Sequence, residues 1–166
     1  LLTDANVESI ASEWSAVASG TLDATLAAIA PPFPFAVIGL GRLGGEELGL
    51  ASDLDILFVY DADGVDRASA AEHIATTLMQ DIGAPTDEGR AFAIDAQLRP
   101  GGRAGALARS VAGYQRHYAE WADTWEIQAL LRARPVAGDR SLGHAFMQMI
   151  EPVVYAPARD TIEATR

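Results

Sequence analysis

The hydrophobic and polar positions of this chain change their period several times, and each period predicts a different element. Over residues 1–29, apolar residues recur every three or four positions, which predicts a helix that Gly20 interrupts. Its apolar stripe comprises Val7, Ile10, Trp14, Val17, Leu22, Leu26 and Ile29. Pro31, Pro32 and Pro34 follow, and proline does not continue a helix, so we expect this helix to end before the first strand.

Three segments predict strands. One apolar run begins at Phe35 and leads into a glycine-rich turn, and a second begins at Leu54 and reaches Tyr60. Over residues 91–99, apolar and polar side chains alternate, which predicts a third strand with two different faces. Its apolar face consists of Phe92, Ile94, Ala96 and Leu98, and its polar face of Asp95, Gln97 and Arg99.

Helical periodicity returns in the rest of the chain. Residues 67–82 predict a helix that turns Ala71, Ile74, Leu78 and Ile82 inward. Residues 110–134 form the longest predicted helix, and we interpret its stripe of Val111, Tyr114, Tyr118, Trp121, Trp125 and Ala129 as a core seam. Residues 135–139 are expected to break the chain before a helix over 142–150, and residues 158–166 to begin a further element of a larger protein.

Candidate chemistry is concentrated at the start of the second strand. Asp53 and Asp55 are two positions apart, so on a strand they point the same way. Neighbouring carboxylates repel unless a cation lies between them, and Mg²⁺ often shares its oxygen ligands between carboxylates and phosphates. Asp95, on a neighbouring strand, would complete a cage for two metal ions, and Arg99 would bind phosphate oxygens in pairs. The pattern indicates phosphoryl or nucleotidyl transfer.

The glycine-rich turn also fits a dinucleotide-binding fingerprint. Residues 39–44 read Gly-x-Gly-x-x-Gly after a strand, and Asp61 could bind a ribose. That fold needs a helix between the strands, but residues 42–52 contain three glycines, each costing roughly 1 kcal/mol in a helix interior. This interpretation also leaves Asp53 and Asp55 without a role, so we disfavour it.

Composition excludes several classes of function. The 166 residues carry 23 acidic and 12 basic side chains, for a net charge of −11, and we find no basic stripe of the kind that binds nucleic acid. The chain has no cysteine, which excludes disulfides and thiol chemistry. No apolar run approaches the roughly 20 residues of a membrane span, and we see no signal sequence. We therefore expect a cytoplasmic protein that associates with neither nucleic acid nor membrane.

Three blocks of sequence together carry a family resemblance. They are residues 39–61 (GLGRLGGEELGLASDLDILFVYD), 94–107 (IDAQLRPGGRAGAL) and 123–139 (DTWEIQALLRARPVAGD). In this order they resemble the catalytic core of glutamine synthetase adenylyltransferases, members of the DNA polymerase β-like nucleotidyltransferase superfamily. The resemblance implies that Asp53, Asp55 and Asp95 bind two Mg²⁺ ions. It also implies that Gly44 and Gly45 hold the triphosphate of ATP through their backbone N–H groups.

Further expectations follow from the resemblance. Ser52 would join the glycines around the phosphates, and Arg99 and Arg42 would pair with phosphate oxygens. The protein substrate would be glutamine synthetase, which receives AMP on a tyrosine, and a PII-type regulator of nitrogen metabolism would act through the full-length protein. Arg132 and Arg134 either complement a helix dipole or face phosphate. His117 is expected to be a surface histidine, because metal-assisted transfer needs no imidazole base, and His73 and His144 are expected to be structural or exposed.

The family's members are longer chains with two related halves, and this chain resembles one of them. The segments 47–49 and 124–130 are more similar to the adenylylating half. The alternative is the deadenylylating half, in which phosphate attacks AMP–tyrosine and releases ADP. A non-catalytic docking domain is a further alternative, although the three aspartates argue against it.

The fold that we expect is α+β: a small mixed or antiparallel sheet of the polymerase β-like nucleotidyltransferase type. The sheet would carry Asp53, Asp55 and Asp95 and would have helices on one face, with further helices flanking it. We divide the chain into an N-terminal helical segment (1–30), the nucleotidyltransferase domain (31–145) and the start of a following helical region (146–166).

Overall fold

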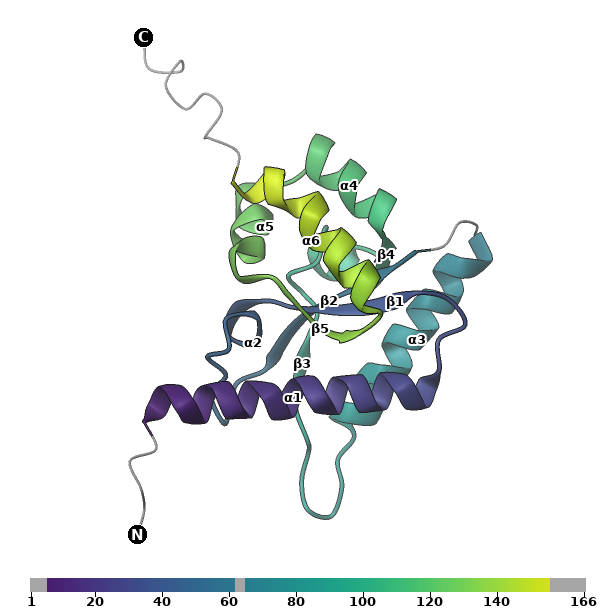
Figure 1. Ribbon diagram of the computed structural model, residues 1–166. Helices are drawn as coiled ribbons and strands as arrows, with labels where there is room; N and C mark the ends of the chain where they lie inside the picture. The colour runs from purple at the N-terminus through teal and green to yellow at the C-terminus, as the bar shows by residue number, and fades with distance from the viewer. Residues whose placement is uncertain (1–5, 62–64, 156–166) are drawn as a thin grey trace.

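A mixed five-stranded sheet forms the centre of the protein. The computed structural model describes residues 6–61 and 65–155 (Figure 1). The strands are β1 (Phe35–Gly39), β2 (Leu54–Tyr60), β3 (Ile94–Asp95), β4 (Ala108–Ser110) and β5 (Arg134–Gly138). Their order is β3-β2-β1-β5, and β4 pairs with β2 as well.

Strand direction decides between the two interpretations of the glycine-rich turn. β1 is antiparallel to β2, with Val37 opposite Phe58. A dinucleotide-binding βαβ unit requires parallel strands joined by a full helix. Here the connection holds only α2 (Gly41–Gly44), one turn long. The Rossmann alternative is therefore excluded, as its glycine content predicted.

Helices cover both faces of the sheet. They are α1 (Val7–Ile29), α3 (Val65–Gly83), α4 (Val111–Glu120), α5 (Thr124–Ala129) and α6 (Arg140–Val154), with 3-10 turns η1 (Gly102–Ala104) and η2 (Leu130–Arg132). The α+β class is confirmed. The prediction placed helices on one face, whereas α1 and α3 lie on one face and α4 and α6 on the other. Every residue of β1 is buried, so this central strand is covered on both faces.

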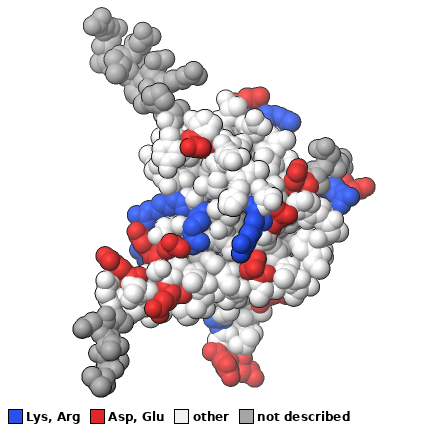
Figure 2. All heavy atoms as spheres, in the orientation of Figure 1, with Lys and Arg blue, Asp and Glu red and all other residues white. Residues whose placement is uncertain are grey.

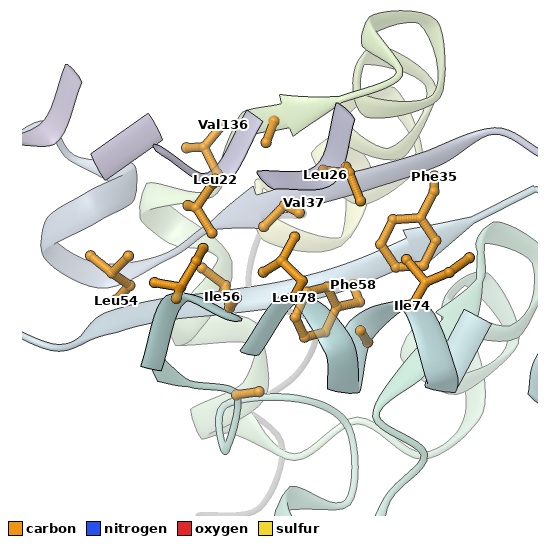
Figure 3. Packing of buried hydrophobic residues seen from close by; sticks show 14 of the residues in the cluster. Leu22, Leu26, Phe35, Val37, Leu54, Ile56, Phe58, Ile74, Leu78 and Val136 are labelled. Carbon is orange, nitrogen blue, oxygen red and sulfur yellow. The ribbon is translucent and has the colours of Figure 1, made fainter. Parts of the chain in front are cut away.

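The larger part of the core lies between the sheet and the α1–α3 layer. Leu22 and Leu26 of α1, together with Ile74 and Leu78 of α3, pack against one face of β1 and β2 (Figure 3). The sheet residues that meet them are Phe35, Val37, Leu54, Ile56 and Phe58. The inward positions predicted for the helix over 67–82 are all buried, so that prediction is confirmed.

The opposite face packs against α4 and α6. The alternate residues of the strands, such as Ile38 and Val59, meet Tyr114 of α4 and Phe146 of α6. The buried Tyr114 hydroxyl donates a hydrogen bond to the Phe58 carbonyl oxygen at 3.2 Å. Because this bond satisfies the polar end of the ring, the tyrosine can be buried completely.

The apolar face predicted for the first helix is partly wrong. Val7, Ile10 and Val17 are exposed, Val7 by 82%. The buried positions are instead Ser15, Ala18, Leu22 and Leu26. Small side chains at 15 and 18 allow close approach, and the Ser15 hydroxyl accepts a hydrogen bond from the Leu48 N–H at 3.1 Å. The helix continues through Gly20, and its predicted residues 1–5 lie outside the described part of the chain.

The single helix predicted over 110–134 is divided into α4, α5 and η2. The chain turns after Trp121, and Asp123 begins α5 in a capping box with Glu126. The capping residues Asp123 and Glu126 thus start a new helix, although the apolar period continues through the break. Tyr114 and Tyr118 form the expected core seam, whereas Trp121 and Trp125 are exposed.

Two strand predictions also need correction. Residues 135–139 were expected to break the chain, but 134–138 form β5, which lies at an edge of the sheet, where proline is tolerated. The strand predicted over 91–99 is only two residues long, because the chain turns after Asp95.

The last helix crosses the predicted boundary between residues 145 and 146 and ends at Val154. Residues 158–166, predicted to begin a further element, lie outside the described residues. Within the described ranges, no helix combines the length and the apolarity needed to cross a bilayer.

Candidate functional site

The three aspartates lie at the end of the sheet where β2 begins. β2 and β3 are parallel, and Asp55 is directly opposite Asp95. Asp53 precedes β2 by one residue and is exposed, while Asp55 and Asp95 are half-buried. The structure therefore brings together carboxylates from two segments that are 40 residues apart, and β4 continues the same edge of β2 beyond the intervening loop.

Asp55 is the electrostatic centre of this group. Burial raises the pKa of its carboxyl group, and the negative charges of Asp95 and Asp53 raise it further, while Arg42 acts in the opposite direction. Each of these charges is therefore close enough to interact with Asp55. A cation placed among them would relieve both the repulsion and the cost of desolvation.

The donor atoms fit a hard cation such as Mg²⁺, which prefers carboxylate oxygens. The side chains are not yet gathered around one point, since no group of three His, Cys, Asp or Glu residues in the described ranges has metal-binding geometry. Asp95 Oδ1 instead accepts a hydrogen bond from the Gln97 N–H at 2.7 Å.

The turn after β1 lies directly against Asp55. Gly41 has a φ of +48°, and a Cβ atom at this position would come within 2.5 Å of Asp55 Oδ2. The Asp55 carbonyl oxygen also accepts a hydrogen bond from the Leu40 N–H at 2.8 Å. Only glycine allows both this backbone conformation and this approach, so Gly41, which the sequence did not single out for the site, shapes it.

Gly44 and Gly45 have roles in packing. Their N–H groups donate hydrogen bonds to the carbonyl oxygens of Leu40 (2.8 Å) and Gly41 (3.1 Å). A Cβ atom at Gly44 would overlap the carbonyl oxygen of Arg132, and one at Gly45 would lie 3.1 Å from its guanidinium. The glycines allow η2 to lie on α2, and phosphate binding through their N–H groups stays a prediction.

The other predicted phosphate ligands stabilise loops near the aspartates. Arg42 Nη1 donates a hydrogen bond to Ser52 Oγ at 3.1 Å, and the Gly49 N–H donates to the same oxygen at 3.2 Å. Ser52 thus closes the turn that precedes Asp53. Contact of Arg42 and Ser52 with phosphate stays a prediction.

Arg99 organises the loop that separates β3 from β4. Its guanidinium donates hydrogen bonds to the carbonyl oxygens of Ala96 (2.7 Å), Gly105 (3.0 Å) and Arg103 (3.1 Å). With three backbone partners it holds the turn that follows Asp95. Pairing of Arg99 with phosphate likewise remains a prediction.

A buried pair that the sequence did not reveal ties this loop to α5. Glu126, 3% exposed, accepts hydrogen bonds from His117 Nε2 (2.7 Å) and from the N–H groups of Gly101 and Asp123 (both 3.1 Å). Burial alone would raise the pKa of Glu126, but these hydrogen bonds outweigh burial, and the pKa lies below its usual value. The prediction that His117 is a surface histidine is wrong: its side chain is 15% exposed and its ring pairs with the buried Glu126, so it has a structural role.

Arginines and glutamates surround α2. Arg132 forms an ion pair with Glu47, and Arg134 Nη2 lies 3.7 Å from Glu46 Oε1. Figure 2 shows basic side chains gathered across the middle of one face of the molecule, between α1 and the α6 layer, with acidic side chains beside them. Each of these two arginines therefore lies beside a glutamate.

Comparisons of the sequence with known proteins identify its relatives. A sequence model of the glutamate-ammonia ligase adenylyltransferase family matches residues 2–149. The chain is also similar to curated proteins named bifunctional glutamine synthetase adenylyltransferase/adenylyl-removing enzyme. It is 43% identical to the Nocardia farcinica protein over an alignment of 171 residues. This alignment covers 95% of this chain and 16% of the relative.

Two further relatives carry the same name. The Mycobacterium leprae protein is 43% identical over 173 residues, covering 96% of this chain and 17% of its own length. The Mycobacterium tuberculosis protein (strain H37Rv) is 42% identical over 166 residues, covering 95% and 17%. The chain thus spans about one sixth of the length of the curated relatives that it matches.

Proposed function

Because the chain belongs to the glutamate-ammonia ligase adenylyltransferase family, we propose that it is a nucleotidyltransferase core that moves AMP from ATP to a tyrosine of glutamine synthetase. The observation that carries this proposal is the pairing of Asp55 with Asp95 beside Asp53, with the pKa of Asp55 raised by their charges. Such a group of carboxylates favours binding of a divalent cation, and a bound divalent cation favours binding of a polyphosphate.

In the proposed reaction the tyrosine oxygen attacks the α-phosphorus of ATP. A bond forms between these two atoms, the bond from the α-phosphorus to the bridging oxygen breaks, pyrophosphate leaves, and the hydroxyl proton passes to solvent. Two Mg²⁺ ions held by Asp53, Asp55 and Asp95 would neutralise the charge that develops on the entering and leaving oxygens. The chain itself supplies the carboxylates and, through Gly41, the close backbone that limits where a substrate can lie.

The direction of transfer is the finer part of the proposal. The segments 47–49 and 124–130 favour the adenylylating half, and the removing half is the second candidate, with phosphate as the attacking group. The same carboxylates would serve both reactions. A PII-type regulator is proposed to act through the full-length protein. A non-catalytic docking role is disfavoured, because a purely structural domain gains nothing from three carboxylates that repel one another.

The intact mass of glutamine synthetase, measured after incubation with this chain and MgATP, tests the proposal. One added AMP per subunit, absent with Asp55→Asn, would support adenylylation at this site. Adenylylated glutamine synthetase with orthophosphate is the second arm, in which loss of AMP would identify the removing half. If neither arm changes the mass, this chain is not by itself a competent transferase.

A further inference from the structure

Arg132 lies against the turn that approaches Asp55. Its carbonyl oxygen packs on Gly44, its guanidinium lies beside Gly45, and its ion-pair partner is Glu47. The two side chains are 51% and 59% exposed. Arg132 therefore combines a fixed backbone with a guanidinium that can reach solvent.

Arg134, at the same turn, has a structural role. Its Nε and Nη2 atoms donate hydrogen bonds to the carbonyl oxygens of Gly44 (3.2 Å) and Leu43 (3.1 Å). These bonds satisfy the C-terminal end of α2 and hold it to β5. For Arg132, by contrast, the side-chain partner within the described residues is the Glu47 carboxylate.

The short helix α2 joins this guanidinium to the aspartates. Gly41, at its first position, lies over Asp55, and Gly45, just after its last, lies beside Arg132. At 1.5 Å per residue the two glycines are separated by about 6 Å along the helix. A triphosphate whose α-phosphate lies at the aspartates could therefore extend along α2 toward Arg132.

The ion pair with Glu47 is easily exchanged. Exposed pairs of this kind stabilise a protein by about 0.2–1 kcal/mol, so their opening costs little. A guanidinium presents a planar fork of donors that fits phosphate oxygens in pairs, and a polyphosphate carries more negative charge than one carboxylate. The polyphosphate would therefore displace Glu47 from Arg132.

On the proposed function as a premise, we propose that Arg132 binds the polyphosphate of the nucleotide and that Glu47 occupies Arg132 when no nucleotide is bound. Glu47 is then a built-in competitor of the nucleotide. This assigns different roles to two neighbouring arginines: Arg134 holds α2 in place, and Arg132 contacts ligand. Removal of the Glu47 carboxylate should therefore tighten nucleotide binding.

Calorimetric titration of the whole chain with MgATP, with MgADP and with AMP tests this assignment. Arg132→Gln should weaken MgATP binding by about 10-fold to 100-fold, the range expected for a lost hydrogen bond between charged groups. It should weaken MgADP binding as well and leave AMP binding unchanged, because AMP lacks the terminal phosphates. Glu47→Gln should tighten MgATP binding by about two-fold to five-fold.

Thermal unfolding controls for misfolding. Arg132→Gln should unfold within about 4 °C of wild type, because an exposed pair contributes at most about 1 kcal/mol, whereas Arg134→Gln should unfold earlier. Unchanged MgATP affinity in Arg132→Gln would overturn the assignment of Arg132, and unchanged affinity in Glu47→Gln would overturn the competition. Wild-type protein that binds no MgATP would instead overturn the proposed function itself.

Discussion

Ionised Asp55 is destabilised by its surroundings in the free protein, and a bound cation would relieve this destabilisation. Its carboxyl group is half-buried and faces two other carboxylates, which together raise its pKa. A carboxyl group with a raised pKa favours the folded state most below its unfolded pKa, and this contribution is lost as the pH rises through the folded value. At neutral pH the site therefore opposes folding.

Asp55→Asn should accordingly raise the melting temperature at neutral pH while it abolishes transfer. Each kcal/mol of repulsion removed corresponds to roughly 2–4 °C for a chain of this size. The gain should disappear in acid, where Asp55 is protonated in both states. Scanning calorimetry across pH measures this, with Asp87→Asn in the exposed 84–89 loop as the control. An equal or lower melting temperature in Asp55→Asn would contradict the electrostatic argument.

Gly44 offers a second test at the scale of one residue, because a methyl group there would overlap the Arg132 carbonyl oxygen. We expect Gly44→Ala to destabilise the protein by about 1–3 kcal/mol, as overpacking usually does. Gly20→Ala is the matched control: in the middle of α1 no atom other than the adjoining backbone of the helix lies within 4 Å of the added Cβ, so it should stabilise by about 0.5–1 kcal/mol. Urea unfolding of both variants gives the comparison, and a neutral Gly44→Ala would show that η2 can move.

At the scale of elements, the loop after β3 is attached to α5 through Glu126. The carboxylate receives hydrogen bonds from His117 and Gly101, and its lowered pKa means that it stabilises the fold above its unfolded pKa. This contribution is lost as the pH falls through the folded value. The loop leads directly from Asp95, so its attachment bears on the site.

Glu126→Ala should therefore cost about 1–3 kcal/mol, the penalty for buried donors left without an acceptor. Hydrogen exchange should accelerate in residues 99–105, and the stability difference from wild type should shrink in acid. Glu126→Gln keeps one oxygen for Gly101 and should lose less. Exchange in this loop that is the same in all three proteins would rule out the attachment.

Elements that are determined by neighbouring residues could be predicted from the sequence, and features that depend on distant contacts could not. The α3 face and the two central strands were predicted correctly, because their apolar periods are long and uninterrupted. The division between α4 and α5 was missed, although Asp123 and Glu126 have capping-box spacing, since the apolar period runs through the break. The outward turn of Val7 and Val17 could not be predicted from the apolar period, because the buried face of α1 contains Ser15, whose hydroxyl accepts a hydrogen bond from Leu48, 33 positions away.

The candidate site likewise has a part that the sequence predicts and a part that it does not. The pairing of Asp55 with Asp95 follows from two strand patterns and was within reach of the sequence. The ion pair of Arg132 with Glu47 joins residues 85 positions apart, and no local pattern points to it. Contacts of that kind become visible only when the sheet brings β5 beside the turn after β1.

At the scale of the whole molecule, the first helix is part of the core. Leu22 and Leu26 of α1 belong to the same buried cluster as the strands that lead to Asp55, so residues 1–30 cover one face of the sheet that carries the site. A truncated chain that begins at residue 31 should therefore expose Val37 and Val136, lose its cooperative melting transition and bind a hydrophobic dye. A chain that begins at Asn6 keeps every described contact and should melt as the full chain does. Circular dichroism and dye fluorescence on the two truncated chains decide the matter: cooperative melting of the shorter one would show that the chain from residue 31 onward folds without α1.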